Sequence, residues 1–387
     1  MRLLHTSDWH LGRSLHREDL IPAQATFADW LVDVATAERV DAVVVAGDVF
    51  DRAVPPVDAV ALADDLLARL SALGVAVVVT SGNHDSAIRL GFGARPARAG
   101  GVHLRTAVAD LASPVLLTDA QGEVAVYGLP YLDPDATRAA LEADRSHQSV
   151  LAAAMVRVRA DAAARPDVAR RVVVAHAFVQ GGQACDSERD MRVGGVDSTP
   201  AGVFGVGSDA GPAYVALGHL HAAQDVAPAV RYAGSPLPYS FSEAGHTKSV
   251  TLVDLGADGS VRTEALPTPV PRAMATVTGD LEALLEDPAL ARWEDAWVRA
   301  VLTDSRRPEA PMERLRSRFP HALVLEFAPV GGEPSLADDL RRARATVDPV
   351  ELSTRFVDYV TGGPVDDAEL AVLAAAHEDA LRAELSG

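Results

Sequence analysis

The sequence predicts an α/β fold, with a largely parallel sheet at the centre of the first 268 residues. Continuous β-branched runs at 41–46 and 75–80 are typical of strands that are buried on both faces. Amphipathic stretches with helical spacing lie between these runs, as at 57–73. Polar residues follow the runs directly, at the edge where open α/β sheets bind their ligands.

The expected elements alternate between strand and helix, an order that gives parallel strands joined by right-handed crossovers. Strands are expected at 2–5, 41–46, 75–80, 124–129, 171–175 and 213–217, and helices at 27–40 and 57–73. Closely spaced strand-like segments at 230–233, 249–255 and 261–265 predict a hairpin series in a second, more antiparallel sheet. The glycine-rich stretch 181–211 predicts a long loop, and loops of that length are often functional.

A stiff linker divides the chain where prolines occupy positions 267, 269 and 271, because proline disrupts both helices and sheets. The domains expected are therefore 1–268, a small α/β domain at 269–346, and C-terminal helices at 347–387. In the small domain, strands are expected at 273–278, 297–302 and 322–327, with helices at 281–292 and 311–318. The last segment has two amphipathic stretches, separated by Gly362, Gly363 and Pro364.

Composition excludes several classes of protein. The chain has 54 acidic and 35 basic residues and a net charge of −19, which argues against a basic nucleic-acid coat protein. Its one cysteine, Cys185, excludes an intramolecular disulfide framework. Polar residues come too early for a signal peptide, and no apolar run approaches the roughly 18 residues that would span a membrane. We therefore expect a cytoplasmic protein.

Five expected strands are followed by Asp, Asn or His side chains, which should converge at one edge of the fold. Carboxylate, amide and imidazole groups are ligands for Mn, Mg, Fe or Zn. Two such ions, about 3.5–4 Å apart, clamp the attacking and leaving oxygens in a phosphoryl displacement. A pair at this spacing needs a bridging carboxylate, and Asp48 is the natural candidate. The residues after the strands are Asp8, His10, Asp48, Asp51, Asn83, His84, Asp85, His176, His219 and His221.

These motifs, in this order, resemble the calcineurin-like metallophosphoesterase superfamily and, within it, the SbcD family of nuclease subunits. The resemblance includes the segments 5–12, 45–51, 81–86 and 216–221, and a more subfamily-specific stretch at 231–241. It covers nearly the whole chain. It implies a two-sheet sandwich flanked by helices, a small α/β cap domain that helps to hold DNA, and C-terminal helices.

The resemblance also implies a role for each motif residue. One ion would be bound by Asp8, His10 and His221, the other by Asn83, His176 and His219, and Asp48 would bridge them. His84 would be the catalytic histidine that stabilises or protonates the phosphate and the leaving oxygen. Asp85 would orient His84, and Asp51 would lie near the leaving group. Mn²⁺ is the ion expected, although Mg²⁺, Fe²⁺ or Zn²⁺ would also suit these ligands.

For function, the resemblance implies a nuclease that digests duplex DNA ends 3′→5′ and cleaves hairpins, with roles in DNA repair, replication and recombination. Its partner would be the SMC-like ATPase SbcC, onto which the C-terminal helices would dock; alternatively, these helices would form a hairpin packed on its own core. A homodimer within a heterotetramer, associated with the nucleoid, is expected. In the cap, Arg314, Arg316 and Arg318 would contact DNA phosphates, or alternatively form a solvated helix face with ion pairs.

Two other functions fit part of the pattern. A small-molecule phosphodiesterase or protein phosphatase is one, since the Gly47-Asp48-x-x-Asp51-Arg52 motif also occurs in Ser/Thr phosphatases. Neither enzyme would explain the cap domain or the C-terminal helices. The other is a non-catalytic DNA-end clamp, against which the presence of every expected ligand weighs.

Overall fold

A computed structural model describes residues 1–188, 198–329, 350–351, 353–354, 357 and 365–385. The chain forms two compact units. The first comprises Met1–Thr276 and Asp295–Val298, and the second comprises Val277–Glu294 and Arg299–Gly387. All of the strand-end motifs lie in the first unit.

The first unit contains two six-stranded sheets. The first sheet has the order β14-β13-β1-β4-β5-β6. Strands β1, β4 and β5 are parallel, as predicted; β6, which the sequence analysis did not expect, pairs with β5 in parallel, and β13 joins β1 in antiparallel orientation. The strands are β1 (Arg2–Thr6), β4 (Ala42–Ala46), β5 (Ala76–Thr80), β6 (Val102–Arg105), β13 (Ser249–Leu255) and β14 (Val261–Pro267).

The second sheet, in the order β11-β12-β10-β9-β8-β7, differs from the sequence-based expectation. Its interior pairs β8–β9, β9–β10 and β10–β12 are parallel, and only the edge pairs are antiparallel. The expected hairpin series is therefore split: β12 joins this sheet, whereas β13 and β14 extend the first sheet. The strands are β7 (Val115–Asp119), β8 (Gly122–Leu129), β9 (Arg170–His176), β10 (Tyr214–Gly218), β11 (Gln224–Ala227) and β12 (Val230–Tyr232).

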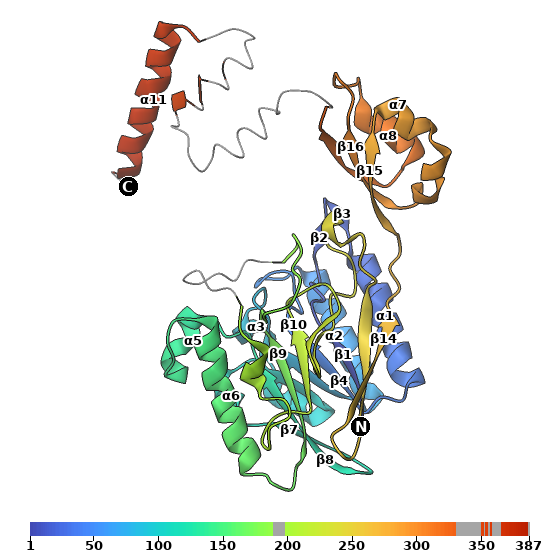
Figure 1. Ribbon diagram of the computed structural model, residues 1–387, viewed down its shortest axis with the longest axis vertical. Helices are drawn as coiled ribbons and strands as arrows, with labels where there is room; N and C mark the ends of the chain where they lie inside the picture. The colour runs from blue at the N-terminus through green and yellow to red at the C-terminus, as the bar shows by residue number, and fades with distance from the viewer. Residues whose placement is uncertain (189–197, 330–349, 352, 355–356, 358–364, 386–387) are drawn as a thin grey trace. The chain divides into compact units, whose positions relative to one another are not determined.

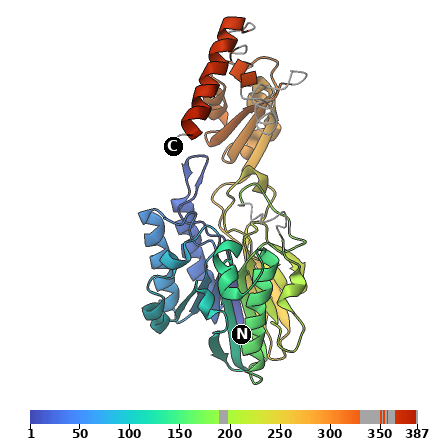
Figure 2. The same cartoon turned by 90° about the vertical axis from the view of Figure 1, so that its left-hand side faces the viewer.

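Helices cover the outer faces of the two sheets (Figures 1 and 2). Helices α1 (Ile21–Ala37) and α2 (Val57–Ala72), in blue, pack on the first sheet, and α5 (Pro134–Leu141) and α6 (His147–Ala163), in green, pack on the second. Helix α1 begins earlier than the spacing predicted because Pro22, which lacks an N–H, is tolerated in a first helical turn. Short elements complete the unit: β2 (Ser14–Leu15), β3 (Glu18–Asp19), α3 (Ala87–Leu90), α4 (Ala94–Ala97) and 3₁₀ turns at Arg98–Gly100, Val108–Asp110, Ala201–Phe204 and Phe241–Glu243.

Alternation along the strands divides the core into three layers. On β4, Val43 and Val45 pack against the helices of the first sheet, whereas Val44 points between the two sheets. On β9, Val173 packs beneath α6 and Val174 points between the sheets. Because both faces of these strands are buried, their sequences are continuous apolar runs, which made them recognisable.

A three-stranded sheet, in the order β15-β16-β17, follows the proline-rich linker. Its strands are β15 (Met274–Gly279), β16 (Trp297–Leu302) and β17 (Ala322–Phe327), and its helices are α7 (Leu281–Glu286) and α8 (Pro311–Arg318). The helix expected over 281–292 ends at Glu286 because Asp287, which precedes Pro288, is extended; a 3₁₀ turn, Pro288–Trp293, follows. Helix α11 (Asp367–Leu385) is the second of the expected C-terminal helices. Of the first, the apolar positions Leu352, Phe356 and Val360 lie outside the described residues.

Candidate metal centre

The polar motif residues lie where the carboxyl ends of strands from both sheets meet. The β10 residue Gly218 lies against β4 so closely that a Cβ at this position would stand 1.9 Å from the Ala46 carbonyl oxygen. The loop after β1 is tied to the loop after β4, since the Asp8 amide donates to Gly47 O at 3.1 Å and the His10 amide to Asp48 O at 3.0 Å. The seven residues predicted as ligands therefore gather in one cluster, in which all but the half-buried Asn83 are buried: Asp8, His10, Asp48, Asn83, His176, His219 and His221.

Asp48 stands at the centre of this cluster. Its Oδ2 atom lies 3.6 Å from His10 Nε2 and 3.5 Å from His176 Nε2. Its Oδ1 atom accepts the His84 backbone amide at 2.9 Å, which fixes the carboxylate. The two neighbouring imidazoles belong to different predicted ligand groups, so Asp48 Oδ2 lies between the two groups.

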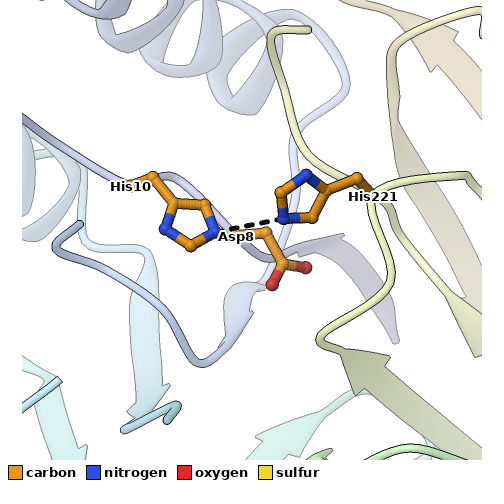
Figure 3. Close-up of side chains that lie close together, drawn as sticks. All are labelled: Asp8, His10 and His221. Atoms are coloured by element: carbon orange, nitrogen blue, oxygen red, sulfur yellow. Dashed lines mark hydrogen bonds between the residues drawn. The ribbon is translucent and has the colours of Figure 1, made fainter. Parts of the chain in front are cut away.

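The first predicted ligand group consists of Asp8, His10 and His221, whose potential ligand atoms all lie within 4.8 Å of one another (Figure 3). His10 Nε2 and His221 Nε2 are 3.1 Å apart. The Asp8 carboxylate is oriented by Ser7 Oγ at 2.5 Å and by the His219 backbone amide at 3.0 Å. Two imidazoles and one carboxylate therefore converge on a small buried volume.

The second group is arranged around the Asn83 side chain. Asn83 Oδ1 lies 2.8 Å from His176 Nε2 and 3.3 Å from His219 Nδ1. His176 Nδ1 lies 2.9 Å from the Ala46 carbonyl oxygen and must donate its proton there, because a carbonyl only accepts. His176 Nε2 is consequently an unprotonated acceptor, directed at Asn83 and Asp48.

The histidines of both groups are neutral near pH 7. Burial lowers the pKa of His176 to about 4 and that of His221 to about 4. Burial, reinforced by the neighbouring histidines, lowers the pKa values of His10 and His219 well below the usual range. Burial raises the pKa of Asp8 well above its usual range, and the charge of Asp48 raises it further.

These groups fit a pair of divalent cations. Acceptor atoms of His176, Asn83 and Asp48 face one another with no proton between them, an arrangement that a cation would make favourable. Among the described residues, His10 Nδ1 is buried and lacks a hydrogen-bond partner. The oxygen and imidazole donors suit Mn, Fe, Zn or Mg and do not select one of them.

The backbone around the cluster is strained in the manner of a functional site. Asp8, His10 and Asp48 have φ values of 52°, 44° and 51°, a left-handed conformation that costs non-glycine residues about 1–3 kcal/mol each. Gly82 allows the loop after β5 to approach, since a Cβ there would lie 2.1 Å from Asp48 Oδ1. Gly82 is thus required by the close approach of the loops after β4 and β5.

The contacts of His84 correct one expected role. His84 Nδ1 donates to the backbone carbonyl of Asp51 at 2.7 Å, so Asp51, and not Asp85, provides the orienting acceptor. The Asp85 carboxylate instead accepts the backbone amides of Val49, Phe50 and Gly82 at 3.1, 2.9 and 2.9 Å. Asp85 therefore ties the loop after β5 to the loop after β4.

Two residues that the sequence analysis did not single out border the cluster. The Tyr239 ring makes edge-on contacts with the rings of His10 and His221, at centroid distances of 5.4 and 5.7 Å. Arg13 lies over the Tyr239 ring at 5.1 Å, and its Nη1 is 3.7 Å from Asp51 Oδ1. Tyr239 belongs to the subfamily-specific stretch 231–241, and this membership could have identified it as a residue near the site. Arg13 closely follows the first motif, but no pattern in the sequence indicated that its side chain would border the cluster.

The three cap arginines expected at DNA lie on helix α8 or at its end and bond to groups of their own unit. Arg314 pairs with Glu282. Arg316 donates to the Ala322 carbonyl oxygen, at 3.2 Å from both Nε and Nη2. Arg318 donates to the carbonyl oxygens of Leu284 and Asp287, at 3.0 and 2.7 Å. These contacts give each arginine a structural part, and phosphate contact by them stays a prediction.

Comparison with known proteins gives two family matches. A family described as calcineurin-like phosphoesterase matches residues 1–223, and SbcD_C, described as type 5 capsule protein repressor C-terminal domain, matches residues 270–361. Together they support the expected resemblance to SbcD-type subunits. A crystal structure of TT1561 from Thermus thermophilus is similar at 14% identity and a TM-score of 0.40, covering 68% of this chain and 98% of that one. None of the described helices has the length and apolar character to cross a membrane.

Proposed function

We propose, from the premise that this chain belongs to the calcineurin-like phosphoesterase family, that it is a two-metal DNA nuclease subunit of the SbcD type. Its substrates are duplex DNA ends, digested 3′→5′, and hairpins, which it cleaves as an endonuclease. It acts with the ATPase SbcC in DNA repair, replication and recombination.

The position of Asp48 carries the proposal. Its Oδ2 atom lies 3.5–3.6 Å from imidazole nitrogens of both predicted ligand groups, where it would be within reach of both cations. Asp8, His10 and His221 would hold one cation, and Asn83, His176 and His219 the other. Divalent cations bound there would stabilise charge on a phosphoryl oxygen and lower the pKa of an attacking water molecule.

His84 is the group best placed to move a proton. Its Nδ1 proton is held by the Asp51 carbonyl, so only Nε2 can exchange a proton with a substrate. Nε2 lies 4.0 Å from Asp48 Oδ2, at the border of the predicted metal site. From there, protonated His84 stabilises the phosphate and donates a proton to the leaving oxygen, a contribution of typically 10²–10⁴-fold to the rate.

The net charge of −19 limits how this subunit grips DNA. Affinity for duplex DNA comes mainly from cationic groups at phosphates, whereas in this chain 54 acidic residues outnumber 35 basic ones. Bound divalent cations supply positive charge at the cleavage point, which the residue count omits. Most of the remaining affinity would come from SbcC, from a second nuclease subunit and from the cap arginines.

An apolar surface beside the metal cluster supports the homodimer. Val57, Ile88 and Phe92 are 81%, 89% and 89% exposed, and large apolar side chains that are exposed together mark a site of protein association. They lie at α2 and in and just after α3, next to an apolar groove of about 820 Å³ lined by Phe50 and Leu67 among others. A second copy of the chain, presenting the same side chains, would cover this surface.

A nuclease assay tests the proposed function. Purified chain, with Mn²⁺ and with EDTA, is incubated with blunt duplex DNA and hairpin DNA, each with and without SbcC. We expect cleavage that requires the metal and increases with SbcC. Hydrolysis of a small phosphodiester or a phosphoprotein, without cleavage of DNA, would instead establish one of the other enzyme classes. If no substrate were hydrolysed in the presence of metal, the non-catalytic DNA-end clamp would be the remaining function.

A further inference from the structure

A buried ion pair lies behind His221, on the side away from Asp8. Glu243 and Lys248 are 1% and 5% exposed, and Lys248 Nζ pairs with Glu243 Oε2. Lys248 is the one lysine of the chain, against 34 arginines. Neither residue belongs to the predicted ligand set, yet both connect to His221.

A chain of hydrogen bonds joins the His221 ring to this pair. Ser187 Oγ lies 2.8 Å from His221 Nδ1 and 2.5 Å from Glu243 Oε1. A hydroxyl has one proton to donate, and the carboxylate can only accept, so the Ser187 proton goes to Glu243. Ser187 must then accept from His221, which places the imidazole proton on Nδ1. Glu243 Oε1 also lies 3.3 Å from Nδ1, which favours the same tautomer.

Lys248 keeps Glu243 ionised and in place. Its ammonium group donates to Glu243 Oε2, to Ser235 Oγ at 2.9 Å and to the His221 carbonyl oxygen at 2.9 Å, which uses all three of its protons. Burial alone would raise the pKa of Glu243, but the hydrogen bond to His221 and the charge of Lys248 outweigh it and hold that pKa well below its usual range. Lys248 therefore contacts both the backbone of His221 and the carboxylate behind its ring.

We propose that Glu243 and Lys248, acting through Ser187, are positioning residues that hold His221 as the Nδ1–H tautomer, with its Nε2 lone pair directed at the predicted cation beside Asp8. This inference rests on the proposed function for the identity of the ligand, but the tautomer itself is a property of the metal-free chain. It gives a purpose to Ser187, in the long glycine-rich stretch 181–211, and to the residues that follow the stretch 231–241.

The pair's chemistry also explains why lysine occupies this position. The ammonium group of lysine is a compact charge, and its three protons match the three acceptors around Nζ. The planar guanidinium of arginine presents five donors in a rigid fork, which does not match the positions of these acceptors. We therefore expect Lys248→Arg to disturb His221, even though it preserves the charge.

The test uses the full chain and the variants Ser187→Ala, Glu243→Gln and Lys248→Arg. Mn²⁺ binding is measured by calorimetry, and the tautomer of His221 by ¹⁵N NMR of the metal-free protein. We expect the wild type to bind two ions with His221 protonated at Nδ1. In each variant, one of the two ions should bind about 10–100-fold more weakly, the range typical when a partner of a ligating histidine is removed. His221 should also become a mixture of tautomers.

Asp119→Asn is the matched control. It breaks another buried ion pair of the first unit, with Arg170, whose side chains are 9% and 3% exposed. It should lower thermal stability while leaving both Mn²⁺ affinities and the His221 tautomer unchanged. Variants that are folded, as judged by circular dichroism, but keep both wild-type Mn²⁺ affinities and the Nδ1–H tautomer would overturn the inference. Failure of the wild type to bind two ions, with the tautomer shifting in the variants as expected, would instead count against the proposed function alone.

Discussion

His84 donates its Nδ1 proton to the backbone carbonyl oxygen of Asp51 at 2.7 Å. A main-chain acceptor in the loop after β4 thus determines the orientation of an imidazole ring from the loop after β5. The packing of these two loops therefore controls the orientation of the predicted catalytic histidine, and His84 can be replaced without removing any predicted metal ligand.

Replacing His84 by alanine should therefore separate chemistry from binding. We expect the DNA cleavage rate to fall about 10²–10⁴-fold, because a proton donor is removed. Mn²⁺ affinity and DNA affinity should stay near their wild-type values, as measured by calorimetry and by fluorescence anisotropy. His103→Ala, on β6, is the control and should cleave normally. Wild-type cleavage by His84→Ala would remove His84 from the mechanism.

Replacing Asp48 by asparagine should have opposite effects with and without metal. In the metal-free protein, the variant should be as stable as the wild type or more stable, since it removes a charge that raises the pKa of the buried Asp8 carboxyl. With Mn²⁺ at about 100 times the wild-type dissociation constant, the wild type should gain about 2.7 kcal/mol or more of unfolding free energy.

The Asp48→Asn variant should gain little from Mn²⁺, because both ions lose a shared ligand. Thermal unfolding with EDTA and with Mn²⁺ measures both quantities. A substitution at the exposed Asp225 is the control and should leave the metal-dependent gain intact. If Asp48→Asn were stabilised by Mn²⁺ as strongly as the wild type, Asp48 would not be the bridging ligand.

The cap arginines can be tested as DNA ligands by changing Arg314, Arg316 and Arg318 to glutamine together. We expect weaker binding to duplex DNA and a flatter salt dependence, with the slope of log K against log[salt] falling by about 0.9 for each phosphate that is no longer neutralised. Because Arg318 also supports two backbone carbonyls, thermal stability is measured in parallel. Lower stability with an unchanged salt slope would assign the three arginines to structure alone.

The exposed apolar surface predicts how the chain self-associates. Ile88→Glu combined with Phe92→Glu should convert a dimer into a monomer, measured by light scattering after gel filtration. Burying each side chain in a dimer contributes about 1.5–3 kcal/mol, which a buried, unpaired carboxylate would more than cancel. Val156→Glu, at a 59% exposed position on α6, is the matched control and should remain dimeric. An unchanged mass for the double variant would place any dimer interface elsewhere.

Local sequence determined what could be predicted. The runs Val43–Val45 and Val172–Val174 identified strands that are buried on both faces, and each such strand led to its motif. Which strands pair with one another could not be predicted from local sequence. Strands β12 and β13 are neighbours in the chain but belong to different sheets, because β12 pairs with β10 and β13 pairs with β1. The contact of His84 with a main-chain carbonyl left no side-chain pattern to find. The ion pair of Glu243 and Lys248 could not be predicted either, since in the sequence each residue is indistinguishable from an ordinary surface charge.

A buried ion pair at the far edge of the second sheet should govern part of the acid stability. Arg170 donates to Asp119 through Nη1 at 2.8 Å and Nη2 at 2.6 Å, and the N-terminal ammonium group of Met1 lies 2.8 Å from the same carboxylate. The bond from Arg170 holds the pKa of Asp119 well below its usual range, despite the opposing effect of burial.

A carboxyl whose pKa is lower in the folded than in the unfolded chain stabilises the fold above its unfolded pKa, near 3.9 for aspartate. That stabilisation is lost as the pH falls from there toward the folded pKa. We expect Asp119→Asn to cost about 3–5 kcal/mol at pH 7, because it leaves Arg170 buried without its partner. The difference from the wild type should shrink below pH 4. Urea unfolding of the metal-free proteins at several values between pH 2.5 and pH 7 measures it. A difference that is constant across this range would mean that Asp119 titrates alike in the folded and unfolded chains.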